Sequence, residues 1–167
     1  ERTLVIGSLS KSHAMTGSRL GWIVGPDVAI KNLINLTTHT TYGVAGFIQD
    51  AGEFALKRGQ ILEDQIAAPF RRRHASAMRR LTDRGIDTVP SNASMYLMAD
   101  IRPTGLSGED FAHRLLDTHN IAVMPGESFG DAARGHIRIA LTVADDRLHA
   151  ALDTLAILYT TLTEQAA

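Results

Sequence analysis

The chain has 167 residues, of which 44% are hydrophobic and 21% are charged, and its formal net charge is −1. This balance argues against a nucleic-acid or membrane partner, and no apolar run approaches the ~20 residues that a membrane span needs. The absence of cysteine excludes disulfides and thiolate metal sites, and it fits a cytoplasmic location.

The first predicted elements are two short strands on either side of a polar loop. Residues 4–6, Leu-Val-Ile, form an apolar run too short for a helix, which predicts a strand buried on both faces. Residues 20–24 predict a second strand, which Gly25-Pro26 ends. We expect both strands to belong to a larger parallel sheet. Because Glu1 stands directly before the first strand, the sequence indicates the C-terminal part of a longer protein.

Three helices are predicted next. Asp27 is the expected N-cap of a helix through about residue 36, and residues 37–41, Thr-Thr-His-Thr-Thr, are expected to form a loop. A second helix is expected from about residue 44 to residue 57, ending near Gly59. A long helix follows, in which Pro69 should produce a kink without ending the element.

The remainder of the chain predicts a compact α/β sandwich. Ser107 is the expected N-cap of one of its helices, with Asp110 in the carboxylate position of a capping box. The expected domains are therefore residues 1–58, part of a large sheet domain, and residues 59–167, the long helix with a small domain. The predicted strands are residues 88–89, 95–99, 121–124 and 136–141, and the predicted helices are about residues 108–119 and 145–164.

The loop between the first two strands carries a lysine among phosphate-binding residue types. Lys11 follows Ser8 and Ser10, and Arg19 comes later in the same loop. A lysine near a sheet edge, partly desolvated and close to another cation, becomes a nucleophilic amine. Arginine and hydroxyl groups are the donors that a phosphate needs. Together they suggest a Schiff-base lysine with pyridoxal phosphate (PLP). The residues alone leave open a solvated surface loop.

Two other catalytic patterns occur in the sequence. Residues 8–11 have the form S-x-x-K of penicillin-binding proteins, but the companion S-D-N and K-T-G elements are absent. Residues 126–130, Gly-Glu-Ser-Phe-Gly, have the form of the G-x-S-x-G nucleophile elbow. The strand predicted from residue 136 leaves little room for the helix that this elbow needs. We therefore interpret residues 126–130 as a loop near a substrate site.

Residues 136–141 predict a strand with an arginine on one face. The period of two places Arg138 opposite the face of Ile137, Ile139 and Leu141. Periodicity alone favours a solvent-facing arginine. The functional alternative is a bidentate fork for the α-carboxylate of an amino acid.

Two further polar groups indicate no site. Residues 71–74, Arg-Arg-Arg-His, with Arg79 and Arg80, form a basic stretch, but acidic residues lie nearby, which favours a solvated or interdomain face over a nucleic-acid site. His113 and His119 are not at the i, i+4 spacing that places two ligands on one helix face. No metal site is predicted.

The segment from Ser8 to Trp22 resembles the cofactor-lysine signature of class I/II aminotransferases, the fold-type I PLP-dependent enzymes. The spacing of Lys11 and Arg19 agrees with that signature, as do Gly17 and Gly21. The resemblance extends to the end of the chain. Within the family, the chain is similar to bacterial enzymes of the arginine–pyruvate or aspartate type. The further segments in family order are residues 70–73, 124–126, 129–130 and 136–140.

The resemblance implies an α/β fold, the C-terminal portion of a fold-type I transferase. Lys11 would be the catalytic residue and would bind PLP covalently, while Ser8, Ser10 and Arg19 would hold the cofactor phosphate. Arg138 would bind the substrate carboxylate. An amino acid and a 2-oxo acid would be the substrates of a homodimer with its sites at the subunit interface.

In this family the N-terminal half supplies the glycine-rich phosphate turn, the aromatic ring stacked on the cofactor and the acid that pairs with the pyridinium nitrogen. The isolated chain is therefore expected to be inactive. Two alternatives stay open. One is an aminotransferase-like effector domain of a transcriptional regulator, and the other is a PLP-dependent lyase or decarboxylase on the same scaffold.

Overall fold

The computed structural model describes residues 2–166. The chain divides into two compact units, residues 1–68 and residues 69–167. The division falls inside helix α4 (Gly59–Thr82), at Pro69, which the helix accommodates without ending. The domain boundary predicted near residue 58 stays a prediction for the complete protein.

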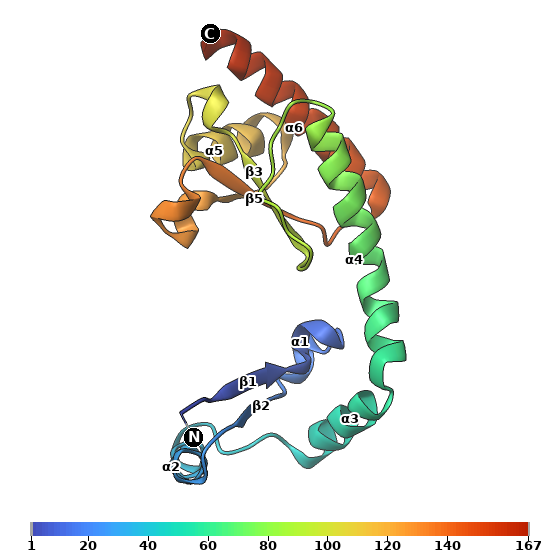
Figure 1. Cartoon of the computed structure of the whole chain (residues 1–167), viewed down its shortest axis with the longest axis vertical. Helices are drawn as coiled ribbons and strands as arrows, with labels where there is room; N and C mark the ends of the chain where they lie inside the picture. The colour runs from blue at the N-terminus through green and yellow to red at the C-terminus, as the bar shows by residue number, and fades with distance from the viewer. Residues whose placement is uncertain (1, 167) are drawn as a thin grey trace. The chain divides into compact units, whose positions relative to one another are not determined.

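The first unit contains a two-stranded antiparallel sheet. Strand β1 (Val5–Ser8) pairs with β2 (Gly21–Val24), and the short helix α1 (Leu9–Ser12) lies between them in the chain (Figure 1). Both predicted strands are confirmed, and they pair antiparallel. The larger parallel sheet to which they were expected to belong stays a prediction for the complete protein. Expected burial on both faces is wrong for this chain, because Ile6 is 76% exposed. Among the described residues of this unit, no other strand pairs with either one.

Close packing holds the end of this sheet to the second helix after it. Leu9 is fully buried. A side chain on Gly52 of α3 (Gly46–Lys57) would overlap Leu20 and crowd Leu9 at 3.3 Å. Gly52 thus lets α3 pack against Leu9 and Leu20, the residues at the two ends of the polar loop. This packing fixes the positions of both ends of the loop.

Helix α2 (Asp27–Thr40) continues through residues that were predicted to form a loop. The hydroxyls of Thr37 and Thr38 donate to the carbonyl of Ile34 at 2.9 and 2.8 Å, and Thr40 donates to Leu36 at 2.8 Å. These threonines satisfy their hydroxyls on carbonyls of the preceding turn, so their polarity does not break the helix.

The helix starts in this unit differ slightly from the predictions. Asp27 is the first residue of α2 rather than its N-cap, which is Pro26. The Asp27 carboxylate instead pairs with Lys31 at 2.7 Å. Helix α3 begins two residues later than expected, and Gly59, with φ of 57°, follows its end and starts α4.

The second unit is a two-layer sandwich. Its antiparallel sheet has the order β3 (Tyr96–Asp100), β5 (His136–Ala140), β4 (Met124–Pro125). Helices α5 (Gly108–His119) and α6 (Asp145–Ala166), with the second half of α4, cover one face of this sheet (Figure 1). Residues 88–89 form only an isolated bridge between Thr88 and Ala99, so the strand predicted there is wrong.

The two faces of this sheet differ in chemistry. The covered face carries Leu97, Ala99, Ile137 and Ile139, all buried against the helices. The alternation predicted around Arg138 is therefore confirmed. The other face carries polar and aromatic residues: Tyr96, Met98, Asp100, His136 and Arg138.

Local capping and ion pairs fix the helices of this unit. Ser107 caps α5 as predicted, its hydroxyl accepting from the backbone N–H of Asp110 at 3.0 Å. Arg80 of α4 pairs with Asp153 of α6 at 3.2 Å, and the Ser76 hydroxyl lies 2.9 Å from Nε2 of His149. Part of the basic stretch is therefore paired within the unit.

Candidate active site

A cavity of about 540 Å³ in the first unit brings together three of the predicted site residues, Ser8, Ser10 and Arg19. Ser8 ends β1 and caps α1. Its hydroxyl accepts from the backbone N–H of Ser10 at 3.1 Å and donates to the carbonyl of Leu20 at 3.3 Å. The two serines therefore stand where the chain leaves a strand and begins a helical turn.

Arg19 sits in a backbone conformation that few non-glycine residues adopt. Its φ is 53° and its ψ is 39°, in the left-handed region. Nη1 donates to the carbonyl of Thr16 at 3.0 Å, and the Thr16 hydroxyl donates to the carbonyl of Ser10 at 2.8 Å. The loop thus holds the guanidinium beside the serines at a cost in backbone strain, which is frequent at ligand sites.

Lys11 lies in α1, one residue after Ser10, with an exposed side chain. It does not line the 540 Å³ cavity. The chain has two other lysines, Lys31 and Lys57, and each pairs with a carboxylate one helical turn away, at 2.7 and 2.5 Å. Within residues 2–166, Lys11 makes no such ion pair.

Arg138 lies at the centre of the second unit's uncovered sheet face. Met98 and Met124 stand beside it on the two neighbouring strands. Its guanidinium carbon is 4.1 Å from the centre of the Tyr96 ring and 4.5 Å from that of Phe129. Its Nε atom is buried and has no hydrogen-bond partner among the described residues. The buried N–H donor at Nε therefore lacks a hydrogen-bond acceptor within the described residues.

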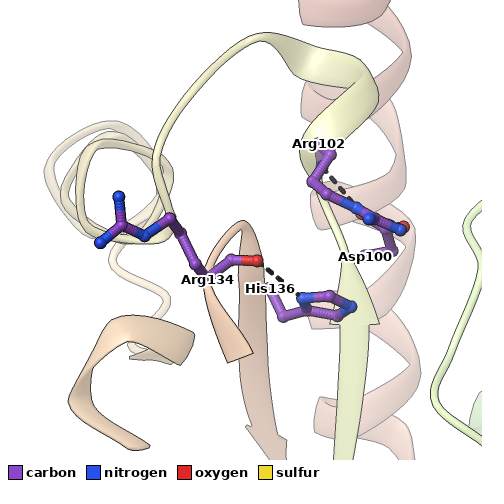
Figure 2. A network of polar contacts seen from close by, with 4 residues as sticks. All are labelled: Asp100, Arg102, Arg134 and His136. Atoms are coloured by element: carbon purple, nitrogen blue, oxygen red, sulfur yellow. Dashed lines mark hydrogen bonds and ion pairs between the residues drawn. The ribbon is translucent and has the colours of Figure 1, made fainter. Parts of the chain in front are cut away.

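The carboxylate that lies one diagonal step from Arg138 on the same sheet face is engaged elsewhere. Asp100 turns toward Arg102, whose Nε donates to both carboxylate oxygens at 2.9 and 3.0 Å (Figure 2). The Arg102 hydrogen bond holds the pKa of Asp100 below its ordinary value. Across the sheet, the His136 ring contacts the backbone carbonyl of Arg134 at 3.0 Å (Figure 2).

The loop of residues 126–130, predicted to be near a substrate site, is the 3-10 turn η3 (Gly126–Phe129), and a second turn, η4 (Asp131–Ala133), follows it. This loop supplies Phe129 and Glu127, to which the sequence alone assigned no individual role. Tyr96 was missed as well. Tyr96 alternates with the buried residues of β3 and therefore lies on the same sheet face as Arg138. This alternation is the sequence pattern that could have identified it.

The described residues contain no group of three or more histidine, aspartate or glutamate side chains arranged to hold a metal ion. None of the helices within residues 2–166 combines the length and the hydropathy needed to cross a membrane.

Comparison with known proteins identifies relatives across nearly the whole chain. The chain is 42% identical over 167 residues to the arginine–pyruvate transaminase AruH of Pseudomonas aeruginosa, covering 99% of this chain and 42% of that protein. It is 30% identical to aromatic-amino-acid aminotransferase 2 of Thermococcus litoralis, covering 93% of this chain and 40% of the relative. The chain therefore spans about two fifths of the length of these curated relatives.

Solved structures show the same fold. The aromatic aminotransferase of Pyrococcus horikoshii matches with a TM-score of 0.91 at 31% identity, over 96% of this chain and 44% of that one. An aspartate aminotransferase of Thermus thermophilus matches with a TM-score of 0.86 at 30% identity, over 93% and 41%. The predicted fold class, an α/β portion of a fold-type I transferase, is confirmed. The family "Aminotransferase class I and II" matches residues 1–155. The chain belongs to this family of aminotransferases.

Proposed function

We propose that the complete protein carrying this chain is a PLP-dependent aminotransferase that moves an amino group between an amino acid and a 2-oxo acid. The main support from the structure is the grouping of Ser8, Ser10 and Arg19 on one cavity. Lys11 lies between Ser10 and Arg19 in the chain. Two hydroxyls and a planar guanidinium form a donor set that fits a phosphate. The strained backbone of Arg19 is a second sign that this loop is shaped for a ligand.

In this proposal Ser8, Ser10 and Arg19 bind the cofactor phosphate through charge-assisted hydrogen bonds. Lys11 is the covalent attachment point, because an unpaired primary amine beside an anion site can attack a carbonyl. When bound, PLP supplies the electron sink that allows the α-carbon to lose a proton. The side-chain amine of Lys11 would take that proton from the α-carbon as a base and later return it as an acid.

Arg138 is the proposed binding residue for the substrate α-carboxylate. Its Nε is buried without a partner, and Asp100 is occupied by Arg102. A guanidinium binds a carboxylate with two parallel N–H···O bonds, which fixes the orientation of the substrate as well as its affinity.

A turnover assay of the complete protein tests the proposal. Because the relative at 42% identity is named an arginine–pyruvate transaminase, arginine and pyruvate are the first donor and acceptor to assay, followed by aspartate and aromatic donors. We expect alanine and a 2-oxo acid in equal amounts. Ammonia released in place of alanine would indicate a lyase, and CO₂ a decarboxylase. No turnover with any donor would indicate an effector-binding domain. Each of these outcomes would contradict the proposal.

The fragment by itself is proposed to be inactive, and the complete protein to be a homodimer, on the strength of the family resemblance. The cytoplasmic location suggested by the cysteine-free sequence stays a prediction.

A further inference from the structure

The guanidinium of Arg138 is surrounded by aromatic rings rather than by acids. Tyr96 reaches it from β3 and Phe129 from η3, at 4.1 and 4.5 Å from the guanidinium carbon to the ring centres. We call these two rings the aromatic clamp. Within the described residues, no ion pair or hydrogen bond of Arg138 accompanies these contacts, and its Nε is buried without a partner. The two cation–π contacts are thus the electrostatic interactions that the described residues provide for this cation.

A clamp of this kind changes what the arginine can do. Ring faces attract a guanidinium but leave the N–H groups at its edge without acceptors. The rings also restrict the rotamers of a long side chain, so less conformational entropy is lost when a carboxylate binds. By lowering the local dielectric they strengthen any charge-assisted hydrogen bond that forms at the edge.

One carboxylate connects the loop of Phe129 to the strand of Arg138. Oε1 of Glu127 accepts from the backbone N–H of Gly108, at the start of α5, at 3.0 Å. The same oxygen accepts from the N–H of Gly135, directly before β5, at 3.1 Å. A side chain on Gly108 would overlap the other carboxylate oxygen, so this approach requires glycine there. Glu127 thus joins η3, α5 and β5 two residues before Phe129.

We propose that Tyr96 and Phe129 hold Arg138 in the orientation in which its edge takes the substrate carboxylate, and that Glu127 is the positioning residue for the Phe129 half of the clamp. This inference rests on the proposed role of Arg138. It adds three residues that set how well the substrate binds, none of which needs to touch the cofactor.

The aromatic contact is tested in the complete protein with Phe129→Leu, which keeps an apolar side chain and removes the ring. Phe129 is 48% exposed, so this variant should fold. We expect KM for the amino donor to rise about tenfold while kcat changes less than threefold, because the clamp acts on binding. Phe129→Tyr keeps the ring, and it should therefore keep most of the donor affinity that Phe129→Leu loses. Tyr96→Leu should raise KM in the same way.

Phe70→Leu is the matched control. Its ring also lies near an arginine, Arg73, at 5.8 Å, but that arginine is paired with Asp145. The same substitution there should leave KM and kcat unchanged. A rise in KM for Phe70→Leu equal to that for Phe129→Leu would mean that loss of any ring has this effect, and it would overturn the proposal.

Glu127→Gln tests the positioning role. The amide keeps the size of the side chain but loses one acceptor oxygen and the charge that holds two backbone N–H groups. We expect a rise in KM smaller than that for Phe129→Leu. In the double variant Glu127→Gln, Phe129→Leu, KM should equal that of Phe129→Leu alone, because Glu127 acts through the Phe129 ring. Independent, multiplicative effects would contradict a positioning role.

A readout independent of turnover comes from NMR of the complete protein with ¹⁵N-labelled arginine, the Arg138 signal being assigned with Arg138→Lys. The Nε–H proton of Arg138 should resonate upfield of the other arginines because of the ring currents, and should return to the ordinary range in Phe129→Leu. If turnover is absent but this shift is found, the proposed function fails while the clamp stands. An ordinary Nε–H shift, or a shifted proton with KM unchanged in Phe129→Leu, would overturn the proposal.

Discussion

The guanidinium carbon of Arg138 lies 4.1 Å from the centre of the Tyr96 ring, on the face of the sheet that the helices leave uncovered. By register Tyr96 stands opposite Ala140, one diagonal step from Arg138 along the strands. The contact therefore depends on the pairing of β3 with β5, and a shift of one residue would exchange the two faces. The position of the arginine is a property of the sheet, not of a mobile loop.

Arg138→Lys should weaken donor binding without much effect on the chemical step. Lysine keeps the charge but cannot form two parallel hydrogen bonds to a carboxylate. Losing one charge-assisted bond costs about 2 kcal/mol, which is about 30-fold in KM. Steady-state kinetics of the complete protein measure this. An unchanged KM would refute the role assigned to Arg138.

Arg102→Ala should also raise KM, although Arg102 is not proposed to touch the substrate. Its removal frees the Asp100 carboxylate, which lies on the same sheet face one diagonal step from Arg138. An opposite-charge pair at this spacing is worth up to about 1 kcal/mol, so we expect about a threefold to fivefold rise in KM.

The double variant Arg102→Ala, Asp100→Asn provides the control for that experiment. It removes the competing carboxylate, so KM should return toward that of the unsubstituted protein. A double variant as impaired as Arg102→Ala alone would show that Arg102 acts by another route.

Glu127 should contribute to stability in a pH-dependent way. Its own backbone N–H, followed by those of Gly135 and Gly108, holds its pKa below the ordinary value of 4.5. A depressed pKa in the folded state contributes stability above pH 4.5, and this contribution is lost as the pH falls through the folded-state pKa. We expect Glu127→Gln to lower Tm at pH 7.

Thermal unfolding of the complete protein at pH 7, 5 and 3.5 tests this prediction. The Tm difference between Glu127→Gln and the unsubstituted protein should be similar at pH 7 and 5 and should shrink at pH 3.5. A difference that stays constant across this range would mean that the carboxylate charge plays no part.

Lys11→Ala should abolish turnover, because the variant loses both the attachment point and the group that moves the proton. Lys31→Ala is the matched control. That lysine pairs with Asp27 on the exposed surface of α2, so its removal should leave kcat unchanged. Residual turnover in Lys11→Ala above one thousandth of the unsubstituted rate would contradict the catalytic role.

Several elements could be predicted because local signals agree with the tertiary structure. Helix α5 has the predicted bounds, since Ser107 caps its start and an αL residue, Asn120, follows its end. Strand β5 follows the alternation of Ile137 and Ile139, whose burial sets the face of Arg138. In both cases the sequence pattern and the core favour the same arrangement.

Other features depend on contacts that periodicity does not encode. The threonines of residues 37–40 stay helical because their hydroxyls bond carbonyls of the preceding turn. Ile6 is exposed because the described residues contain no strand or helix that covers it. Phe129 and Glu127 come from a 3-10 turn, where neither period applies, and their partners in β5 and α5 are fixed only by the fold.

The proposed attachment of PLP to Lys11 is tested by borohydride reduction of the complete protein incubated with PLP, followed by peptide mapping of the labelled lysine. We expect one pyridoxyl group per subunit, on Lys11. Label on Lys31, on Lys57 or on a lysine outside this chain, with Lys11 unmodified, would contradict it.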